Sequence, residues 1–243
     1  MADQVKSLKA YVYEGLMIFF AVSLGFIAEN IRDTVAERNK ERVLMESIVT
    51  NLKIDTAALN IVIEGNIKKN RVFDSLIVLA NQNLNDTLIR KQFYGFFIAG
   101  TYMSLFLPSD AALVQIKTDG GLGLISKKGV ADSILNYDKG NESLLRHNQV
   151  YTEESDDLWE AGFTILELRI TKDLKYVDFF NGRKMTGLLP PPIVTDPDKL
   201  KVFFGRLTRC LLLTQTNRNM MIRHRQRAEN LIQYLTDTYG LEN

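Results

Sequence analysis

One apolar run near the N-terminus constrains this chain more than any other feature of its sequence. Residues 10–28 read AYVYEGLMIFFAVSLGFIA and hold a single charged side chain, Glu14. As a helix the run would be about 28 Å long, close to the roughly 30 Å hydrocarbon core of a bilayer. Glu14 lies near one end, beside Tyr11 and Tyr13, where lipid headgroups would tolerate a carboxylate. The sequence therefore predicts an N-terminal tail and transmembrane anchor over residues 1–28.

The run is also compatible with a signal peptide or a buried core helix. A cleaved signal peptide would end in small residues, whereas this run continues into Glu29, Asn30 and Arg32 with helical character. A buried core helix stays open as the second alternative, because uncharged runs like residues 15–28 also occur in soluble proteins. The anchor prediction selects the residues that would face lipid or a neighbouring helix, among which glycine and serine permit close helix approach. They are Glu14, Gly15, Phe19, Phe20, Ser23, Gly25 and Phe26.

A heavily charged segment follows the apolar run. Between Glu29 and Glu46 there are five acidic and four basic residues, with opposite charges three or four positions apart, as in Arg42 and Glu46. Hardly any apolar side chain interrupts residues 35–43, so such a helix has no face to bury. We expect a solvated helical neck over residues 29–42.

From residue 43 to residue 243 the apolar pattern has a helical period. Positions spaced by three, four and seven residues predict a helix that packs on others. They are Met45, Ile48, Leu52, Leu59, Val62, Val72, Leu76 and Leu79. Asp196 and Pro197 are a typical N-cap and first position for the last helix. The predicted fold class is all-α: a transmembrane helix that continues into a stalk and an extramembrane helical bundle.

Residues 92–109 hold no charge, which raises the alternative of a second membrane span or a re-entrant segment. Glycines and Pro108 interrupt the run, so a central core helix is the better prediction. Its aromatic side chains would then fill the core. They are Phe93, Phe96, Phe97, Tyr102 and Phe106.

The next segments carry turn signals. Residues 108–110 should start a short helix that ends at Gly120 and Gly121. Ser126 is expected to cap a long helix that reaches Leu168, with a break near Gly140. The glycines before Lys127 match no phosphate-binding motif, and no strand precedes them.

Nothing in the sequence points to catalysis. The net charge of +1 gives no reason to expect nucleic acid as a partner, and Cys210, the one cysteine, is expected in the core. His147 and His224, the two histidines, lack ligand spacing and are expected to be solvated or capping residues. The acidic residues at 153, 154, 156 and 157 are interpreted as a solvated helix face. We predict no catalytic, metal or cofactor-binding residue, no cofactor, and no enzyme.

Three features exceed what folding of a bundle requires, and we select them as candidate partner-binding residues. Trp159 lies among the acidic residues, Pro190, Pro191 and Pro192 form an extended loop, and an arginine-rich helix face near the C-terminus could meet an anionic partner or lipid. The arginines selected are Arg218, Arg223 and Arg225.

Two passages resemble a bacterial family of uncharacterised single-pass proteins. The first is YVYEGLMIFFAVSLGFIAENIRDTVAER, a Glu-led apolar helix that runs into a charged helix. The second, LPSDAALVQIKTDGGLGLISKKGVADSILNYDKGNESL, is similar to the family's central block of a proline, an Ile-Lys pair, a glycine turn, a Leu-Ile pair and a helix ending in tyrosine. Those positions are Pro108, Ile116, Lys117, Gly120 or Gly121, Leu124, Ile125, Ile134 and Tyr137. The resemblance implies an inner-membrane anchor and an exported helical body, and supplies no catalytic residue.

Orientation and function follow from these points as expectations. The basic residues after the anchor outnumber those before it, which favours a cytoplasmic body, whereas the resemblance implies a periplasmic one, and we follow the resemblance. The leading hypothesis is a structural or interaction protein, an accessory or scaffold subunit of an envelope complex in the bacterial inner membrane. Its partners would be the lipid bilayer, other membrane or envelope proteins, or a second copy of the chain. The alternative is a sensor or small-ligand-binding helical domain.

Overall fold

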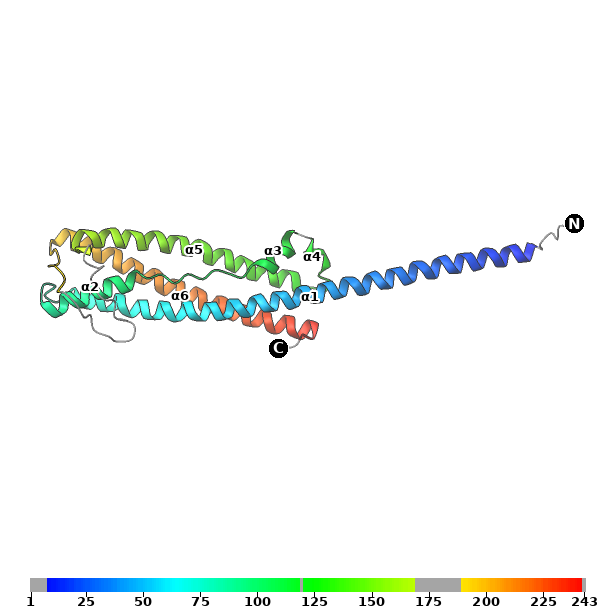
Figure 1. The fold of residues 1–243 in the computed structure, drawn as a ribbon, viewed down its shortest axis with the longest axis horizontal. Coiled ribbons are helices and arrows are strands. Elements are labelled where there is room, and N and C mark those ends of the chain that lie inside the picture. The colour runs from blue at the N-terminus through cyan, green and yellow to red at the C-terminus, as the bar shows by residue number, and fades with distance from the viewer. Residues whose placement is uncertain (1–7, 119, 169–188, 242–243) are drawn as a thin grey trace.

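The computed structural model describes residues 8–118, 120–168 and 189–241. These residues form helices and no strand (Figure 1). The helices are α1 (Leu8–Leu79), α2 (Thr87–Thr101), α3 (Ala111–Thr118), α4 (Gly121–Leu124), α5 (Val130–Ile165) and α6 (Pro197–Tyr239). The predicted all-α class, a long apolar N-terminal helix followed by a helical bundle, is confirmed.

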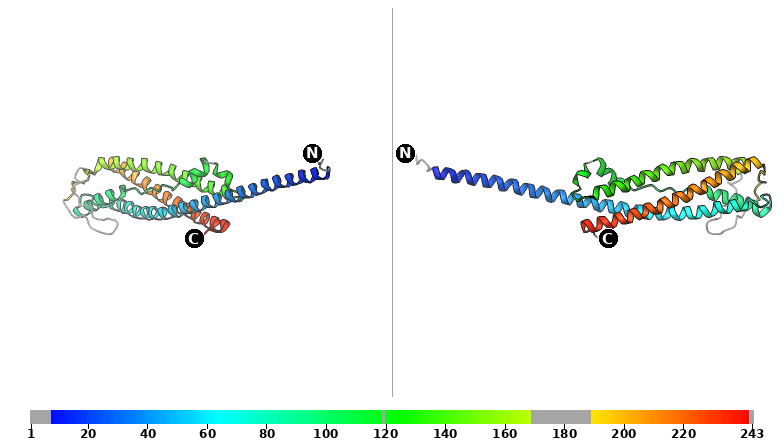
Figure 2. Two further views of the ribbon diagram at one scale, coloured as in Figure 1. Left: turned by 45° about the vertical axis from the view of Figure 1, so that its right-hand side comes forward. Right: turned by 180° about the vertical axis from the view of Figure 1, so that it is seen from behind.

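Helix α1 is one unbroken element of 72 residues with two unlike halves. Its first half projects alone from the bundle, and the second half packs along α6 and α2 (Figures 1 and 2). Side chains from 11 to 40 are exposed, with only Ser23 half-buried, whereas Glu41 is buried at the entry to the bundle. The stripe predicted from Met45 to Leu79 is buried throughout.

Three clusters of apolar side chains fill the bundle along its length. The neck-end cluster contains Met45, Ile48 and Leu235, the middle cluster Leu59 and Met221, and the far-end cluster Phe73, Phe97 and Phe203. Helix α6 contributes to all three and packs against both α1 and α5. Since α1 and α6 run antiparallel, the C-terminal end of α6 lies beside the neck (Figure 1).

The fourth position of the bundle is shared by α2 and an extended segment, residues 102–110. The core-helix prediction for residues 92–109 therefore holds only as far as Thr101. Phe93, Phe97 and Phe106 are buried as expected. The prediction was wrong for Tyr102, which is 64% exposed because the chain leaves the helix there, while Phe96 is half-buried. Among the described residues, α1 is the one helix long and apolar enough to cross a membrane.

The ends of the helices test the turn predictions. The Asp196 carboxylate accepts a hydrogen bond from the Lys199 N–H, with Pro197 at the start of α6, as predicted. Gly120 follows α3 with φ 69°, a left-handed conformation that suits glycine. The prediction was wrong for Ser126, since Gly129 precedes α5 and Ser126 instead binds Glu41.

Helix α5 also continues through Gly140 without the expected break. A Cβ atom at Gly140 would lie 2.6 Å from the His224 ring, so this glycine permits close packing of α5 on α6. Gly65 has a similar role on α1, because its Cβ position lies 3.4 Å from Ser104 Cβ in the extended segment.

Candidate functional site: the α5–α6 groove

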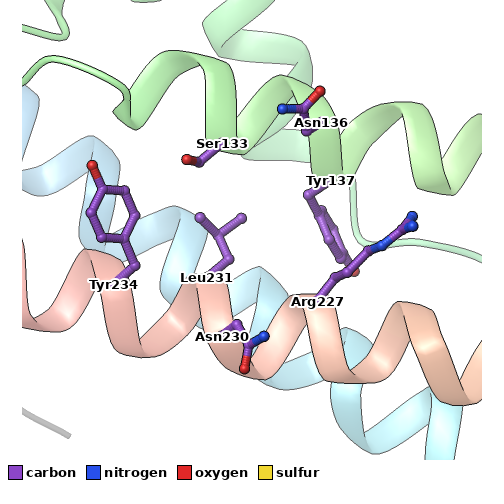
Figure 3. A pocket seen from close by; sticks show the side chains of 7 residues that line it. All are labelled: Ser133, Asn136, Tyr137, Arg227, Asn230, Leu231 and Tyr234. Atoms are coloured by element: carbon purple, nitrogen blue, oxygen red, sulfur yellow. The ribbon is translucent and has the colours of Figure 1, made fainter.

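A groove of about 550 Å³ lies between α5 and α6, towards the neck end of the bundle. Seven side chains line it: Ser133, Asn136, Tyr137, Arg227, Asn230, Leu231 and Tyr234 (Figure 3). In the close-up, Tyr137 and Tyr234 stand on either side of Leu231 and Ser133, and Arg227 lies beyond Tyr137. The lining holds one positive charge, no carboxylate, and several hydroxyl and amide groups.

Behind the groove a buried polar network fixes the Tyr137 ring. The Tyr137 hydroxyl donates to Asp55 Oδ2 at 2.8 Å, and the Ser109 N–H donates to Asp55 Oδ1 at 2.7 Å. The Tyr137 ring stacks on His224 with 4.4 Å between centroids, and His224 Nε2 lies 2.7 Å from Asn141 Oδ1. Burial raises the pKa of Asp55 although these hydrogen bonds oppose the rise.

His224 corrects a sequence prediction. We expected a solvated or capping histidine, but the ring is 2% exposed and belongs to the core. Burial, with a smaller contribution from the positive charge of Arg227, lowers the pKa of His224 to about 4. The imidazole is therefore neutral at pH 7, and Asn141 provides the partner that a buried ring nitrogen needs.

The neck end of the bundle is closed by Glu41. Its carboxylate accepts hydrogen bonds from the Tyr239 hydroxyl, the Ser126 hydroxyl and the Ser126 N–H. Burial would raise the pKa of Glu41, but these hydrogen bonds outweigh it and the net pKa is lowered. One side chain thus ties α1 to the end of α6 and to the connection before α5.

The sequence predicted that the acidic cluster on α5 is a solvated face. The structure shows that part of this cluster is buried. Glu154 is 4% exposed and pairs with Arg206 at 3.1 Å and with Arg209 at 2.7 Å. Arg206 also pairs with Asp157 at 2.8 Å. The charge of Glu154 was visible in the sequence, but its two partners lie on α6, more than 50 residues away.

The predicted partner-binding residues do not form one surface. Trp159 lies at the far end of α5, half-buried, with its ring edge-on to Phe97 at 5.2 Å and stacked on Phe163 at 5.8 Å. It therefore supports the fold as well as presenting a surface. Phe163 itself is 60% exposed, so this pair presents aromatic surface at the far end.

The three prolines also lie at the far end. Pro190 is buried, Pro191 is half-buried and Pro192 is exposed, while residues 181–188 of the predicted loop lie outside the described residues. The segment is held after the prolines, where Asn85 exchanges two hydrogen bonds with the Ile193 backbone and Val194 N–H donates to Ile165 O.

The predicted arginines lie along α6, between the middle of the bundle and its neck end. Arg223 is exposed, and Arg218 is half-buried. Arg225 is already engaged, since its Nη1 donates to Asn60 Oδ1 at 2.6 Å and its Nε pairs with Glu229. Of the arginines on this face, only Arg227 lines the groove, and it was not among the residues predicted from the sequence.

A second set of side chains that sequence reasoning missed lies inside the bundle, between the middle and far-end clusters. Lys69 is 3% exposed, and its ammonium lies 4.8 Å from the Tyr151 ring centroid and 5.3 Å from that of Phe73. Among the described residues no hydrogen-bond partner reaches Lys69 Nζ or the side-chain amides of Asn70 and Asn217. Burial lowers the pKa of Lys69 to about 8.

The candidate anchor residues lie on the projecting half of α1. Phe19, Phe20 and Phe26 are exposed, and Phe19 meets Phe20 edge-on at 5.9 Å. Beyond the backbone of their own helix turns and their chain neighbours, no atom lies within 4 Å of the Cβ positions of Gly15 and Gly25. Glu14 is exposed and Ser23 half-buried.

The described residues hold no group of three or more His, Cys, Asp and Glu side chains that could bind a metal ion. Comparison of the chain with protein-family models, with curated proteins and with solved structures finds no match. The resemblance to the single-pass family therefore stays a prediction, and the function has to be argued from the geometry alone.

Proposed function

We propose that this chain is a membrane-anchored structural or interaction protein, in which α1 crosses the bilayer once and carries the bundle. The observation behind the proposal is the projecting half of α1, whose most apolar 18-residue window has no residue buried against the rest of the chain. Helices that are apolar all round need an apolar environment on every side, and a bilayer provides one.

The exposed apolar surface favours an anchor over a core helix of this bundle. Between residues 11 and 28, twelve large hydrophobic side chains are at least 45% exposed. Surface of this extent marks a membrane or partner contact. The helix also continues without a break into the neck and bundle, which favours a retained anchor over a cleaved signal peptide.

The continuous helix also sets the spacing of the bundle from the membrane. If the anchor ends near residue 28, residues 29–40 form about 18 Å of exposed helix before Glu41 enters the bundle. Ion pairs such as Arg32 with Glu29 and Asp33 lie on this neck. A solvated spacer of this kind suits a body that meets its partners at a fixed height above the lipid.

Within this proposal the chain is an accessory or scaffold subunit of a bacterial envelope complex, anchored in the inner membrane with a periplasmic body. The orientation follows the family resemblance, whereas the count of basic residues favours the opposite side. The exposed Phe163 beside Trp159, and Pro192 at the same end, are the surfaces that we expect a protein partner to use.

Two experiments test the proposal separately. Alkaline phosphatase fused to Asn243 should be active in bacteria if the body is periplasmic, and a fluorescent cytosolic reporter at the same position should be dark. The opposite result would reverse the orientation and leave the anchor intact. Membrane fractionation tests the anchor itself: a chain that alkaline carbonate extracts from membranes as a soluble protein would contradict it.

A further inference from the structure

Arg227 is the exposed charge of the α5–α6 groove, and no side chain of the described residues pairs with it. Three arginines of α6 have acidic partners: Arg206 pairs with Glu154 and Asp157, Arg209 with Glu154, and Arg225 with Glu229. Among the arginines of α6 without such a pair, Arg227 is the one that lines the groove. Arg227 lines a hollow that contains no carboxylate. An unpaired guanidinium in a concave site is suited to bind an anion from solution, because its planar donors match a carboxylate in a two-pronged geometry.

The Arg227 side chain lies over Gly140. Its Nη1 atom lies 3.6 Å from the Cβ position of Gly140, which is ordinary van der Waals contact, and the His224 ring lies 2.6 Å from that position. A Cβ atom at 140 would therefore displace the His224 ring. Gly140 thus permits α6 to approach α5 closely and leaves the guanidinium at the end of the groove.

The remaining lining gives the groove an apolar body with polar edges. The rings of Tyr137 and Tyr234 flank Leu231, while Ser133, Asn136 and Asn230 contribute hydroxyl and amide groups (Figure 3). Stacking on His224 and the hydrogen bond to Asp55 hold the Tyr137 ring, and the Tyr234 hydroxyl lies 3.4 Å from Lys128 O. Aromatic walls with a few convergent polar groups are typical of small-molecule sites, whose volumes run from about 300 to 1,000 Å³.

From these contacts we infer that the α5–α6 groove is a binding site for a small organic carboxylate, with its carboxylate on Arg227 and its apolar body along the groove over Leu231 towards Tyr234. One guanidinium matches a single negative charge. The lining has no second cation for a doubly charged phosphate group. The site would make the bundle responsive to a dissolved metabolite, which goes beyond a scaffold role.

Lipid headgroups are a less suitable source of the anion. Arg227 lies 12 residues before Tyr239, which contacts Glu41 at the neck end, so the groove lies up to about 18 Å into the bundle. The neck adds about 18 Å more. The argument against lipid headgroups rests on the proposed anchor, whereas the groove and Arg227 do not depend on it. A failed anchor test and a failed binding test are therefore distinguishable.

The experiment uses the full chain in a non-ionic detergent and 4-fluorobenzoate as the probe, followed by fluorine NMR. Saturable binding is expected, and Arg227→Gln should weaken it at least tenfold. Arg223→Gln is the matched control, because Arg223 lies one turn away on the same helix, is exposed, and does not line the groove. We expect the control to change affinity by less than threefold.

Two further arms complete the test. The neutral probe 4-fluorobenzamide should bind at least tenfold more weakly than the carboxylate, and excess inorganic phosphate should not displace 4-fluorobenzoate. Ser133→Phe should fill the groove and remove binding, with unchanged helical circular dichroism. Absence of saturable binding, equal losses in the two arginine variants, or equal affinity for the neutral probe would each overturn the inference.

Discussion

The two halves of α1 belong to one helix but solve different packing problems. Residues 11–28 are apolar around nearly the whole helix and their large apolar side chains are exposed, whereas residues 44–79 are apolar along one stripe that is buried on α6 and α2. Helix formation alone therefore says little about environment. What distinguishes the halves is how the apolar side chains are distributed around the helix axis.

The polar side chains of the two halves of α1 also differ in their surroundings. In the exposed half, charged residues pair with one another in solvent, as Arg32 does with Glu29. In the buried half, Glu41 and Asp55 each receive hydrogen bonds from other segments. Lys69 departs from that rule because no acceptor among the described residues reaches its ammonium. The buried half is therefore where single substitutions should change stability most.

The largest expected effect comes from the same substitution made in both halves. Leu59 is 0% exposed and Leu24 is 64% exposed. Leu59→Asp should unfold the bundle, since it buries an unpaired charge and removes core packing, at a cost above about 4 kcal/mol. Leu24→Asp should leave the melting temperature of the bundle unchanged and reduce membrane insertion. Circular dichroism and membrane fractionation measure the two effects, and a stable Leu59→Asp variant would break the comparison.

Removal of the Asp55 carboxylate should be the next most damaging change. Asp55→Ala leaves the buried Tyr137 hydroxyl and the half-buried Ser109 N–H without their acceptor, at about 2 kcal/mol for the first and about 1 kcal/mol for the second. We expect a loss of about 3 kcal/mol in the free energy of unfolding, measured by urea denaturation. Asp74→Ala, an exposed residue on the same helix, is the control and should change it by less than about 0.5 kcal/mol.

Lys69→Met should stabilise the bundle, in contrast to the two preceding substitutions. A folded-state pKa of about 8 against a usual 10.5 means that the unfolded chain binds more protons between these values. Stability should therefore rise as the pH increases from 8 to 10.5, and at pH 7 the buried charge should cost about 3 kcal/mol. Methionine fills a similar space without charge and should recover much of this cost, with a flatter stability curve above pH 8. Destabilisation by Lys69→Met would show that contacts with Tyr151 and Phe73 outweigh burial.

Periodicity predicted the parts of the fold that depend on one helix at a time. Met45, Ile48, Leu52, Leu59 and Leu76 could be assigned to the core from spacing alone, since a helix repeats its faces regularly. Spacing could not show that the chain leaves the helix after Thr101, because the uncharged run continues to Ser109. Tyr102 was placed in the core for that reason.

Contacts between distant segments explain the other features that the sequence did not predict. Ser126 has the chemistry of a helix cap, but the Glu41 carboxylate, 85 residues earlier, binds it instead. Ser133 and Arg227 share the groove although they lie on different long helices, so no local motif marks the site. The one sequence signal for the groove was an arginine-rich face on α6, and choosing Arg227 within that face required the position of α5.

Between pH 7 and pH 5 we expect a change in stability that is smaller than the effect of Lys69, and we expect His224 to cause it. Because its pKa is about 4 in the folded chain and near 6.5 when unfolded, the unfolded chain binds more protons between these values. Stability should then fall as the pH drops, by about 2 kcal/mol at pH 5. Because burial also raises the pKa of Asp55, the measured quantity is the difference between the wild type and His224→Gln. Parallel urea-denaturation curves for the two proteins from pH 7 to pH 5 would remove His224 as the cause.

The smallest expected effect lies on the exposed half of α1 and completes the comparison. Arg32 pairs with Glu29 at 3.5 Å and with Asp33 at 3.2 Å, but its side chain is 73% exposed. Ion pairs in solvent gain little, because water and salt screen the attraction and two flexible side chains must be ordered. Arg32→Ala should change the free energy of unfolding by less than about 0.5 kcal/mol, whereas Glu41→Ala, nine positions later on the same helix, should cost several times as much by leaving Ser126 and Tyr239 unpaired. Equal effects in the two variants would mean that the neck is covered in the folded protein, and the boundary between the two halves of α1 would have to move towards the anchor.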